Sequence, residues 1–213
     1  MIIEIGTSDF RTQAGQVDGV FIEPVKYYYD RMRGLALDRS STAGIVSGGE
    51  LIETHKGTGA ISHFENVAIS DYEGDCSVWY VSRETMERYK LPSWVAGCST
   101  MYGFHQSVAK TIQDRRLEFK DVYTEQTTKV IRIKSIIDKY NITSLDLLKI
   151  DTEGHDCIIL NDYLNTVEIL PKVIQFESNE LSDPKEVAKV VSRLKPLGYD
   201  CKQVRFDMIC KLR

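Results

Sequence analysis

Acidic side chains follow several short apolar runs of this sequence, at the point where each run ends. The runs and the residues after them are 2–5 before Gly6-Thr7-Ser8-Asp9, 20–22 before Glu23, 145–150 before Asp151, and 173–176 before Glu177. Such runs are typical of buried parallel strands, whose carboxyl ends meet at one edge of a sheet. Carboxylates gathered there repel one another unless a ligand supplies positive charge or hydrogen-bond donors. The alternative, that each acid only caps the next helix, explains single residues better than the set.

The ligand that this pattern favours is an adenosine without phosphates. Glu23 follows a glycine loop and the second run, where nucleotide-binding α/β folds place the acid that binds ribose hydroxyls. The phosphate-binding patterns G-x-G-x-x-G and G-x-x-x-x-G-K are absent, because Gly6 is not followed by the further glycines of the first pattern. Glu4 and Asp9 would oppose a phosphate but could receive an amine or a sulfonium. This combination points to S-adenosylmethionine.

Strands that alternate with helices are expected to position these residues. Strand patterns cover residues 2–5, 20–22, 64–69, 76–81, 127–133, 145–150, 173–176, 201–204 and 208–212. Helical patterns cover residues 25–37, 83–89, 134–140 and 153–165, and a further helix begins at Pro184 and ends before Gly198. This order predicts an α/β fold with a doubly wound, mostly parallel sheet that ends in a C-terminal antiparallel hairpin.

The connections carry further expectations. Residues 64–69 and 76–81 predict a hairpin around the turn at 71–74, and the first crossover has room only for a stub of helix. The excursion over residues 40–59 is rich in Ser, Thr and Gly and predicts a loop or irregular structure. Residues 91–105 form an aromatic-rich irregular stretch, which is typical of a lid or pocket wall.

The composition excludes several classes of protein. A formal net charge of −4 leaves no basic surplus for general nucleic-acid binding. No apolar run approaches the ~20 residues of a membrane helix, and the N-terminus lacks a signal-peptide pattern, so we expect a cytoplasmic protein. The five cysteines form no C-x-x-C pair and predict reduced thiols, with neither a zinc site nor a disulfide framework. We expect one domain over residues 1–213, and a first strand that starts at residue 2 suggests a fragment or terminal domain of a longer chain.

Five short motifs run through the chain from residue 3 to about residue 178. They are Ile3-Glu4-Ile5-Gly6, Phe21-Ile22-Glu23-Pro24, Asn66-Val67-Ala68-Ile69-Ser70 with Gly74 beyond, Asp146-Leu147-Leu148-Lys149-Ile150-Asp151-Thr152-Glu153-Gly154-His155-Asp156, and Gln175-Phe176-Glu177. In this order they resemble the FkbM-type S-adenosylmethionine-dependent methyltransferases. The resemblance implies a seven-stranded class I methyltransferase fold, Rossmann-like, and a methyl-transferring enzyme of the EC 2.1.1 type.

The resemblance also implies a cofactor site at the carboxyl edge of the sheet. Residues near the methionine part would be Glu4, Gly6, Thr7, Ser8 and Asp9; those near the ribose, Glu23 and Pro24; those beside the adenine, Ala68 and Ile69; and those facing the reacting centre, Asp151 and Glu153. The loop after Gly6 lacks the family's further glycine, so we expect residues 7–9 to depart from the family pattern. The excursion over residues 40–59 has no counterpart in the family.

Many relatives methylate hydroxyl groups, often on sugars, which implies O-methylation of a carbohydrate. The hydroxyl must lose its proton as it attacks, and the candidate bases are Asp151, Glu153, His155 and His105. A sulfonium nearby would weaken the carboxylates as bases, whereas His105 has a more suitable unperturbed pKa. The alternative for this histidine is a packing or surface role.

Two further features bear on the acceptor. Asp151 and Glu177 end adjacent strands and could share Mg²⁺ or another divalent ion that activates a hydroxyl; the alternative is that Glu177 bonds a loop. Trp94, Tyr102 and Phe104, near His105, offer stacking surfaces for a sugar ring.

Two rival functions remain open at this stage. A degenerate glycine loop is compatible with a non-catalytic S-adenosylmethionine-binding or structural module. A nucleotide-sugar-using α/β enzyme is the other rival, weakened by the missing phosphate loop. The expected partners are a small-molecule or glycan acceptor and other domains of the same polypeptide, with no nucleic acid and no membrane span.

Overall fold

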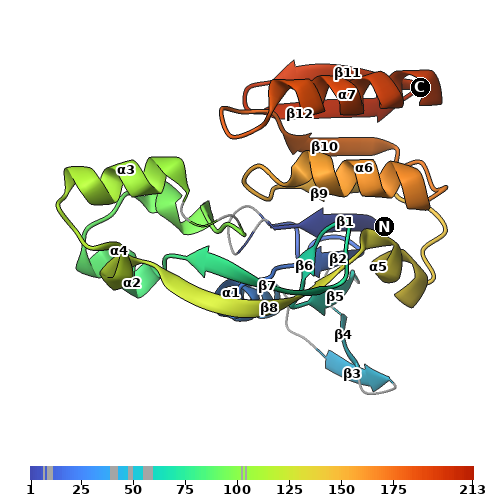
Figure 1. Ribbon diagram of the computed structural model, residues 1–213. Helices are drawn as coiled ribbons and strands as arrows, with labels where there is room; N and C mark the ends of the chain where they lie inside the picture. The colour runs from blue at the N-terminus through green and yellow to red at the C-terminus, as the bar shows by residue number, and fades with distance from the viewer. Residues whose placement is uncertain are drawn as a thin grey trace.

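The computed structural model describes residues 1–6, 8, 12–38, 43–47, 50–54, 60–101, 103 and 105–213. Its main sheet has the strand order β11-β12-β10-β9-β1-β2-β5-β4-β3 (Figure 1). These strands are β1 (Ile2–Ile5), β2 (Gly19–Ile22), β3 (Ala43–Ser47), β4 (Glu50–Thr54), β5 (Ile61–Glu65), β9 (Leu147–Ile150), β10 (Val173–Glu177), β11 (Tyr199–Val204) and β12 (Asp207–Leu212).

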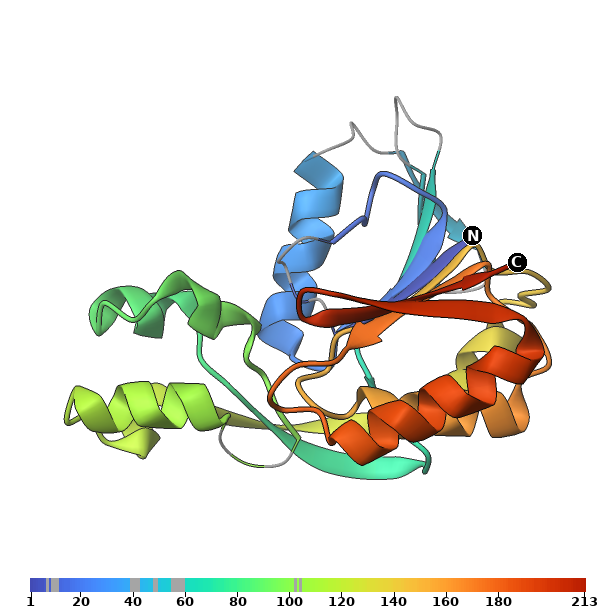
Figure 2. The ribbon, with the colours of Figure 1, turned by 90° about the horizontal axis from the view of Figure 1, so that it is seen from above.

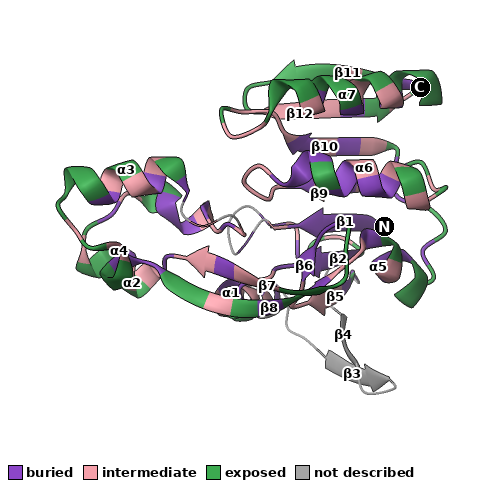
Figure 3. Ribbon diagram, viewed as in Figure 1, coloured by how far each residue is buried: buried purple, intermediate pink, exposed green. Residues whose placement is uncertain are grey.

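The central strands β10-β9-β1-β2-β5 are parallel, and the antiparallel pairs lie at the two edges. All residues of β1 and β2 are buried (Figure 3), as expected for parallel strands covered on both faces. The prediction of a mostly parallel sheet with a C-terminal antiparallel hairpin is therefore confirmed. The strands from β11 to β5 form the seven-stranded unit, and β4 and β3 extend it.

Helices cover both faces of this sheet (Figure 2). On one face α1 (Lys26–Asp38) places Met32 and Ala36 in a buried cluster with Ile2 and Phe21. Alternate residues of a strand point to opposite faces, so Ile3 and its alternates pack on the other side. The helices there are α5 (Ile133–Lys139), α6 (Asp156–Thr166) and α7 (Pro184–Leu194), followed by the short η2 (Lys195–Leu197). This is the doubly wound arrangement.

A lobe lies beyond the carboxyl ends of the parallel strands, on the side toward which the arrows of β1 and β10 point in Figure 1. A three-stranded sheet of order β6-β8-β7 leads to it and back. The elements involved are β6 (Ala68–Ile69), β7 (Gly74–Tyr80), α2 (Arg83–Arg88), η1 (Ser93–Gly97), α3 (Gln106–Asp114), α4 (Phe119–Val122) and β8 (Thr124–Ile131). Val95, Val108 and Ile112 belong to a buried cluster that the lobe shares with Val25 and Tyr28 at the start of α1, so the lobe is packed against the main domain.

Two expectations about the middle of the chain are wrong. Residues 64–69 are not one strand, because β5 ends at Glu65 and β6 begins only at Ala68. Between them, the side-chain amide of Asn66 donates to the carbonyls of Glu23 and Pro24 at 2.8 and 3.1 Å. The hairpin of 64–69 with 76–81 is also absent. The distant strand β8 lies between β6 and β7 and pairs with both, so neither pairs with the other.

The excursion over residues 40–59 was expected to be irregular, yet it contains the antiparallel strands β3 and β4. Pairing of β4 with β5 attaches them to the main sheet. Helices α3 and α4 were not predicted either. None of the helices in the described part of the chain has the length and apolarity needed to cross a membrane.

The cysteine prediction is wrong for one pair. Cys201 and Cys210 form a disulfide across β11 and β12, where the strand register places them opposite each other. The tight turn brings residues 9 apart in sequence face to face. Cys76, Cys98 and Cys157 have free thiols.

Candidate active site

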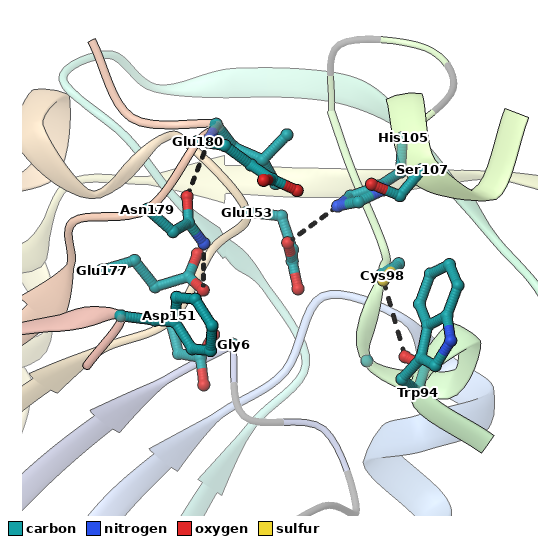
Figure 4. Close-up of a pocket in the computed structure, with 13 residues that line it drawn as sticks. Gly6, Trp94, Cys98, His105, Ser107, Asp151, Glu153, Glu177, Asn179 and Glu180 are labelled. Atoms are coloured by element: carbon teal, nitrogen blue, oxygen red, sulfur yellow. Dashed lines mark hydrogen bonds and ion pairs between the residues drawn. The ribbon is translucent and has the colours of Figure 1, made fainter. Parts of the chain in front are cut away.

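Two cavities adjoin at the carboxyl ends of the central strands, and both have Gly6 and Asp151 in their walls. The larger has a volume of about 530 Å³. The sheet side supplies Asp151 and Glu177, and the lobe supplies Trp94 and His105 (Figure 4). The strand-end acids are thus brought to one edge, and the lobe forms the opposite wall.

Gly6 sets the distance between the ends of β1 and β9. Its N–H donates to the carbonyl of Ile22, and the N–H of Asp151 donates to the carbonyl of Ile5, at 2.9 and 3.0 Å. Gly6 has φ +79°, and a Cβ added there would lie 2.2 Å from the carbonyl oxygen of Asp151. Only glycine permits this approach, so Gly6 fixes the shared wall of the two cavities.

The smaller cavity contains most of the residues expected to hold a cofactor. Glu23, Pro24, Ala68 and Ile69 line it together with the shared Gly6 and Asp151. On its far side are Ser99, Thr100 and Met101, at the base of the lobe. Its volume of about 40 Å³ is much smaller than an adenosine. A nucleoside therefore enters only if the walls of this cavity move outward.

Glu23 has a structural bond as well as a place in this cavity. Its side chain is buried, and Oε1 accepts from the N–H of Val25 at 2.8 Å, just before α1. Glu23 therefore orders the turn before α1 and also lines the cavity. His155 lines the same cavity and bonds Ser70 Oγ through Nε2 at 2.9 Å, and burial lowers its pKa. The lowered pKa makes His155 a weak base, and its Nε2 is already bonded to a hydroxyl. His155 therefore contributes to the wall and is a poor candidate for the catalytic base.

Carboxylates crowd the sheet side of the larger cavity. One oxygen each from Asp151, Glu153 and Glu177 lies within 4.8 Å of the others. Burial raises the pKa of Asp151 to about 7; Lys149 opposes this rise and the neighbouring acids increase it. Burial and the charges of Glu153 and Asp151 likewise hold the pKa of Glu177 well above its usual range. In the free protein, protons neutralise part of this cluster, and a bound cation would replace them.

Glu153 projects into the cavity from a left-handed turn, with φ +54° before Gly154 at φ +100°. A Cβ on Gly154 would lie 3.1 Å from the carbonyl oxygen of Leu181, so glycine lets the two loops approach. Glu153 Oε2 is 3.1 Å from His105 Nε2, with 14% and 7% of the side chains exposed. The imidazole N–H donates in this contact, which holds the carboxylate across the cavity (Figure 4).

Cys98 lies beside this pair, with its sulfur within 4.8 Å of ligand atoms of His105 and Glu153. The arrangement superficially suggests a cysteine nucleophile. Burial raises the pKa of Cys98 far above its usual value, the nearby carboxylates add to this rise, and the thiol donates to the carbonyl of Trp94 at 3.5 Å. In the free protein the thiol therefore favours its protonated form, which makes Cys98 a poor nucleophile.

Asp156, at the start of α6, joins the two loops that carry the carboxylates. Its Oδ1 accepts from the N–H of Thr152 at 3.0 Å and from the hydroxyl of the same residue. Its Oδ2 accepts from the N–H of Glu177 at 2.8 Å. Only 2% of Asp156 is exposed. The residue thus sets the separation between the loop after β9 and the end of β10.

Several expected site residues lie elsewhere. Glu4 is buried and accepts from the N–H of Gln13 at 3.1 Å, and neither Glu4 nor Ser8 lines either cavity. Ser8 is buried with φ +57°. Four residues named from the sequence lie outside the described residues, namely Thr7, Asp9, Tyr102 and Phe104.

Other residues of the larger cavity were not found by sequence reasoning. They are Ser107, Asn179, Glu180, Leu181 and Phe206. Asn179 Nδ2 donates to Glu177 Oε1 at 2.9 Å, so the loop after β10 orients this acid. The one signal in the sequence was the run of polar residues directly after Glu177.

A protein-family model described as Methyltransferase FkbM domain matches residues 6–201. Except for Ile5 and Phe206, every described residue that lines the two cavities falls within this range. No curated protein and no solved structure matches the chain.

Proposed function

The chain belongs to the FkbM methyltransferase family, and on that premise we propose that it is an S-adenosylmethionine-dependent O-methyltransferase acting on a hydroxyl of a sugar or glycan. The observation that carries the proposal is the pair of cavities that share Gly6 and Asp151. Methyl transfer needs two ligands in contact at one point, and positioning provides much of the rate.

The smaller cavity suits the cofactor by its chemistry. Glu23 offers a carboxylate to ribose hydroxyls, and Ala68 and Ile69 offer apolar surface to an adenine ring. Asp151, common to both cavities, supplies negative charge where the two ligands meet. No described residue that lines the smaller cavity is a lysine or arginine, which favours a sulfonium over a phosphate.

When bound, S-adenosylmethionine supplies the methyl carbon, and its sulfur keeps the electron pair of the carbon–sulfur bond that breaks. The acceptor oxygen forms the new bond to that carbon, and its proton must leave. We assign this proton to Glu153, whose carboxylate lines the larger cavity. His105 is a positioning residue, because its Nε2 faces Glu153 and its Nδ1 is buried without a partner among the described residues.

The larger cavity is the acceptor site in this proposal. The ring of Trp94 offers a stacking face, and the side chains of Asn179 and Glu180 offer hydrogen-bond partners for ring hydroxyls. Incubation of the chain with labelled S-adenosylmethionine and a panel of sugars, glycosides, phenols and amines tests this assignment. We expect O-methylated sugars; exclusive transfer to amines or phenols would refute the acceptor class.

A divalent ion is a second candidate for the positive charge that this site requires. The oxygens of Asp151, Glu153 and Glu177 are close enough to share Mg²⁺, which prefers such ligands. Turnover measured with and without EDTA, in the wild type and in Asp151→Asn, separates the two possibilities. Unchanged activity in EDTA would discard the ion.

The rival functions have equally direct tests. A non-catalytic module would bind S-adenosylmethionine without transferring its methyl group to any member of the panel. A nucleotide-sugar enzyme would bind UDP or NAD more tightly than S-adenosylmethionine in calorimetric titrations. Absence of S-adenosylmethionine binding at millimolar concentration would overturn the enzyme proposal.

A further inference from the structure

The described wall of the larger cavity contains acidic side chains without basic ones to balance them. Asp151, Glu153, Glu177 and Glu180 all contribute carboxyl groups, and no described residue in this wall is a lysine or arginine. Walls of one sign focus the field within a cleft, so this cavity attracts cations and repels anions. Glu180 is exposed at the rim, whereas the other acids lie deeper, toward the sheet.

One acceptor atom in this wall has no donor. Glu177 Oε1 is bonded by Asn179, but Oε2 is buried and has no partner within the described part of the chain. In the free protein a proton satisfies this oxygen, because the pKa of Glu177 is raised, and a cationic donor would take the place of that proton. The end of β10 therefore favours a ligand that has both a hydrogen-bond donor and a positive charge.

Two aromatic side chains flank the same space. Trp94 from η1 is 44% exposed, and Phe206 from the turn between β11 and β12 is 72% exposed. The turn is braced, because the carbonyl of Phe206 accepts from the N–H of Ser178 at 2.7 Å and Gln203 Nε2 donates to the carbonyl of Arg205 at 2.9 Å. An exposed ring on a braced turn at a cavity rim offers its face to a ligand, and aromatic faces attract organic cations.

We propose that the acceptor is an amino sugar whose protonated amine binds between Glu177 and Glu180, against Trp94 or Phe206, while its hydroxyl faces Glu153. This inference rests on the proposed methyl transfer and specifies its substrate class. A divalent ion would account for the carboxylates but not for the exposed rings, whereas an organic ammonium accounts for both and provides the donor for Glu177.

Sugars with one ring and different charges test the inference. The probes are glucosamine, N-acetylglucosamine, glucose and glucose 6-phosphate, titrated calorimetrically into the full chain saturated with S-adenosylhomocysteine. We expect glucosamine to bind about ten-fold more tightly than the neutral sugars and the phosphate to bind most weakly. Equal or weaker binding of glucosamine, or binding of none of the probes, overturns the inference.

Variants at the rim make the test specific. Glu180→Gln and Phe206→Ala should each weaken glucosamine binding by about three- to ten-fold more than they weaken glucose binding. Both side chains are exposed, so the fold should tolerate the changes. Glu168→Gln is the matched control, because this exposed acid lies in the connection before β10, at the opposite edge of the sheet. A loss of the same size in the control would contradict the assignment.

Two further outcomes separate this inference from the proposed function. If every sugar binds only with added Mg²⁺ or Mn²⁺ and the preference for glucosamine disappears, the ion supplies the charge and the inference is wrong. If neutral sugars are methylated as well as amino sugars, O-methyl transfer stands and only the ammonium is refuted. Absence of both S-adenosylmethionine binding and transfer would remove the proposed function itself.

Discussion

Replacing Gly6 by alanine should damage both folding and cofactor binding, for a reason visible in the backbone. The new Cβ would lie 2.2 Å from the carbonyl oxygen of Asp151, so the ends of β1 and β9 must move apart by close to an ångström. A non-glycine residue at φ +79° adds strain of about 1–2 kcal/mol, and forcing extra volume into a packed site costs about 1–3 kcal/mol. The free energy of unfolding should therefore fall by at least about 2 kcal/mol.

Thermal unfolding, calorimetric titration with S-adenosylmethionine and a methyl-transfer assay measure these effects. The melting temperature should drop by at least about 4 °C, and the methyl-transfer rate should fall about 10²-fold because Asp151 is displaced. Gly34→Ala is the control: it lies within α1, and a Cβ there would meet nothing within 4 Å. It should stabilise the helix by about 0.5–1 kcal/mol and leave cofactor affinity unchanged. Wild-type stability and affinity in Gly6→Ala would refute the reasoning.

Three other changes address the residues around this junction. Glu153→Gln should lower kcat about 10²–10⁴-fold with unchanged cofactor affinity. His105→Gln, which keeps an N–H for Glu153, should retain more activity than His105→Ala. Equal losses in the two histidine variants would contradict a positioning role. Because the pKa of Asp151 in the folded protein is raised to about 7, folding favours its protonated form, and the free energy of unfolding should fall as pH rises from about 4 to about 7. Urea unfolding of Asp151→Asn should match the wild type near pH 4 and exceed it above pH 7, and a pH-independent difference would contradict the assignment. Asp156→Asn turns an amide N–H₂ toward the N–H of Glu177, and urea unfolding should show a loss of about 1–3 kcal/mol; an unchanged midpoint would show that this bond contributes nothing.

Much of the sheet was predictable because its strands are short apolar runs with clear ends. Residues 2–5 are apolar except for Glu4, with isoleucines on both faces of the strand, so they fit a buried central strand, and the acid or glycine after each run marked the carboxyl edge. The errors lie where a distant segment decides the structure. Residues 64–69 look continuous in sequence, but the bonds from Asn66 to Glu23 and Pro24 divide them.

The site was predictable to a similar degree. Asp151, Glu153 and Glu177 follow strands and were named from the sequence, whereas Phe206 and Glu180 were not. Their place in the cavity depends on β12 pairing antiparallel with β10 and on the side chain of Gln203, which bonds the carbonyl of Ser178 at 2.9 Å. The cross-strand disulfide was missed for the same reason, since the pairing of Cys201 with Cys210 follows from strand register. The pattern of residues within one segment does not show which distant strand it will pair with.

The most direct test of the central claim is a single methyl-transfer measurement. The purified chain is incubated with S-adenosylmethionine carrying a labelled methyl group and with glucosamine and glucose as acceptors, and the products are read by mass spectrometry. The account predicts a labelled O-methyl sugar that forms with the wild type and is reduced about 10²–10⁴-fold with Glu153→Gln. No labelled sugar from the wild type, or equal product from both proteins, would contradict methyl transfer at the junction of the two cavities.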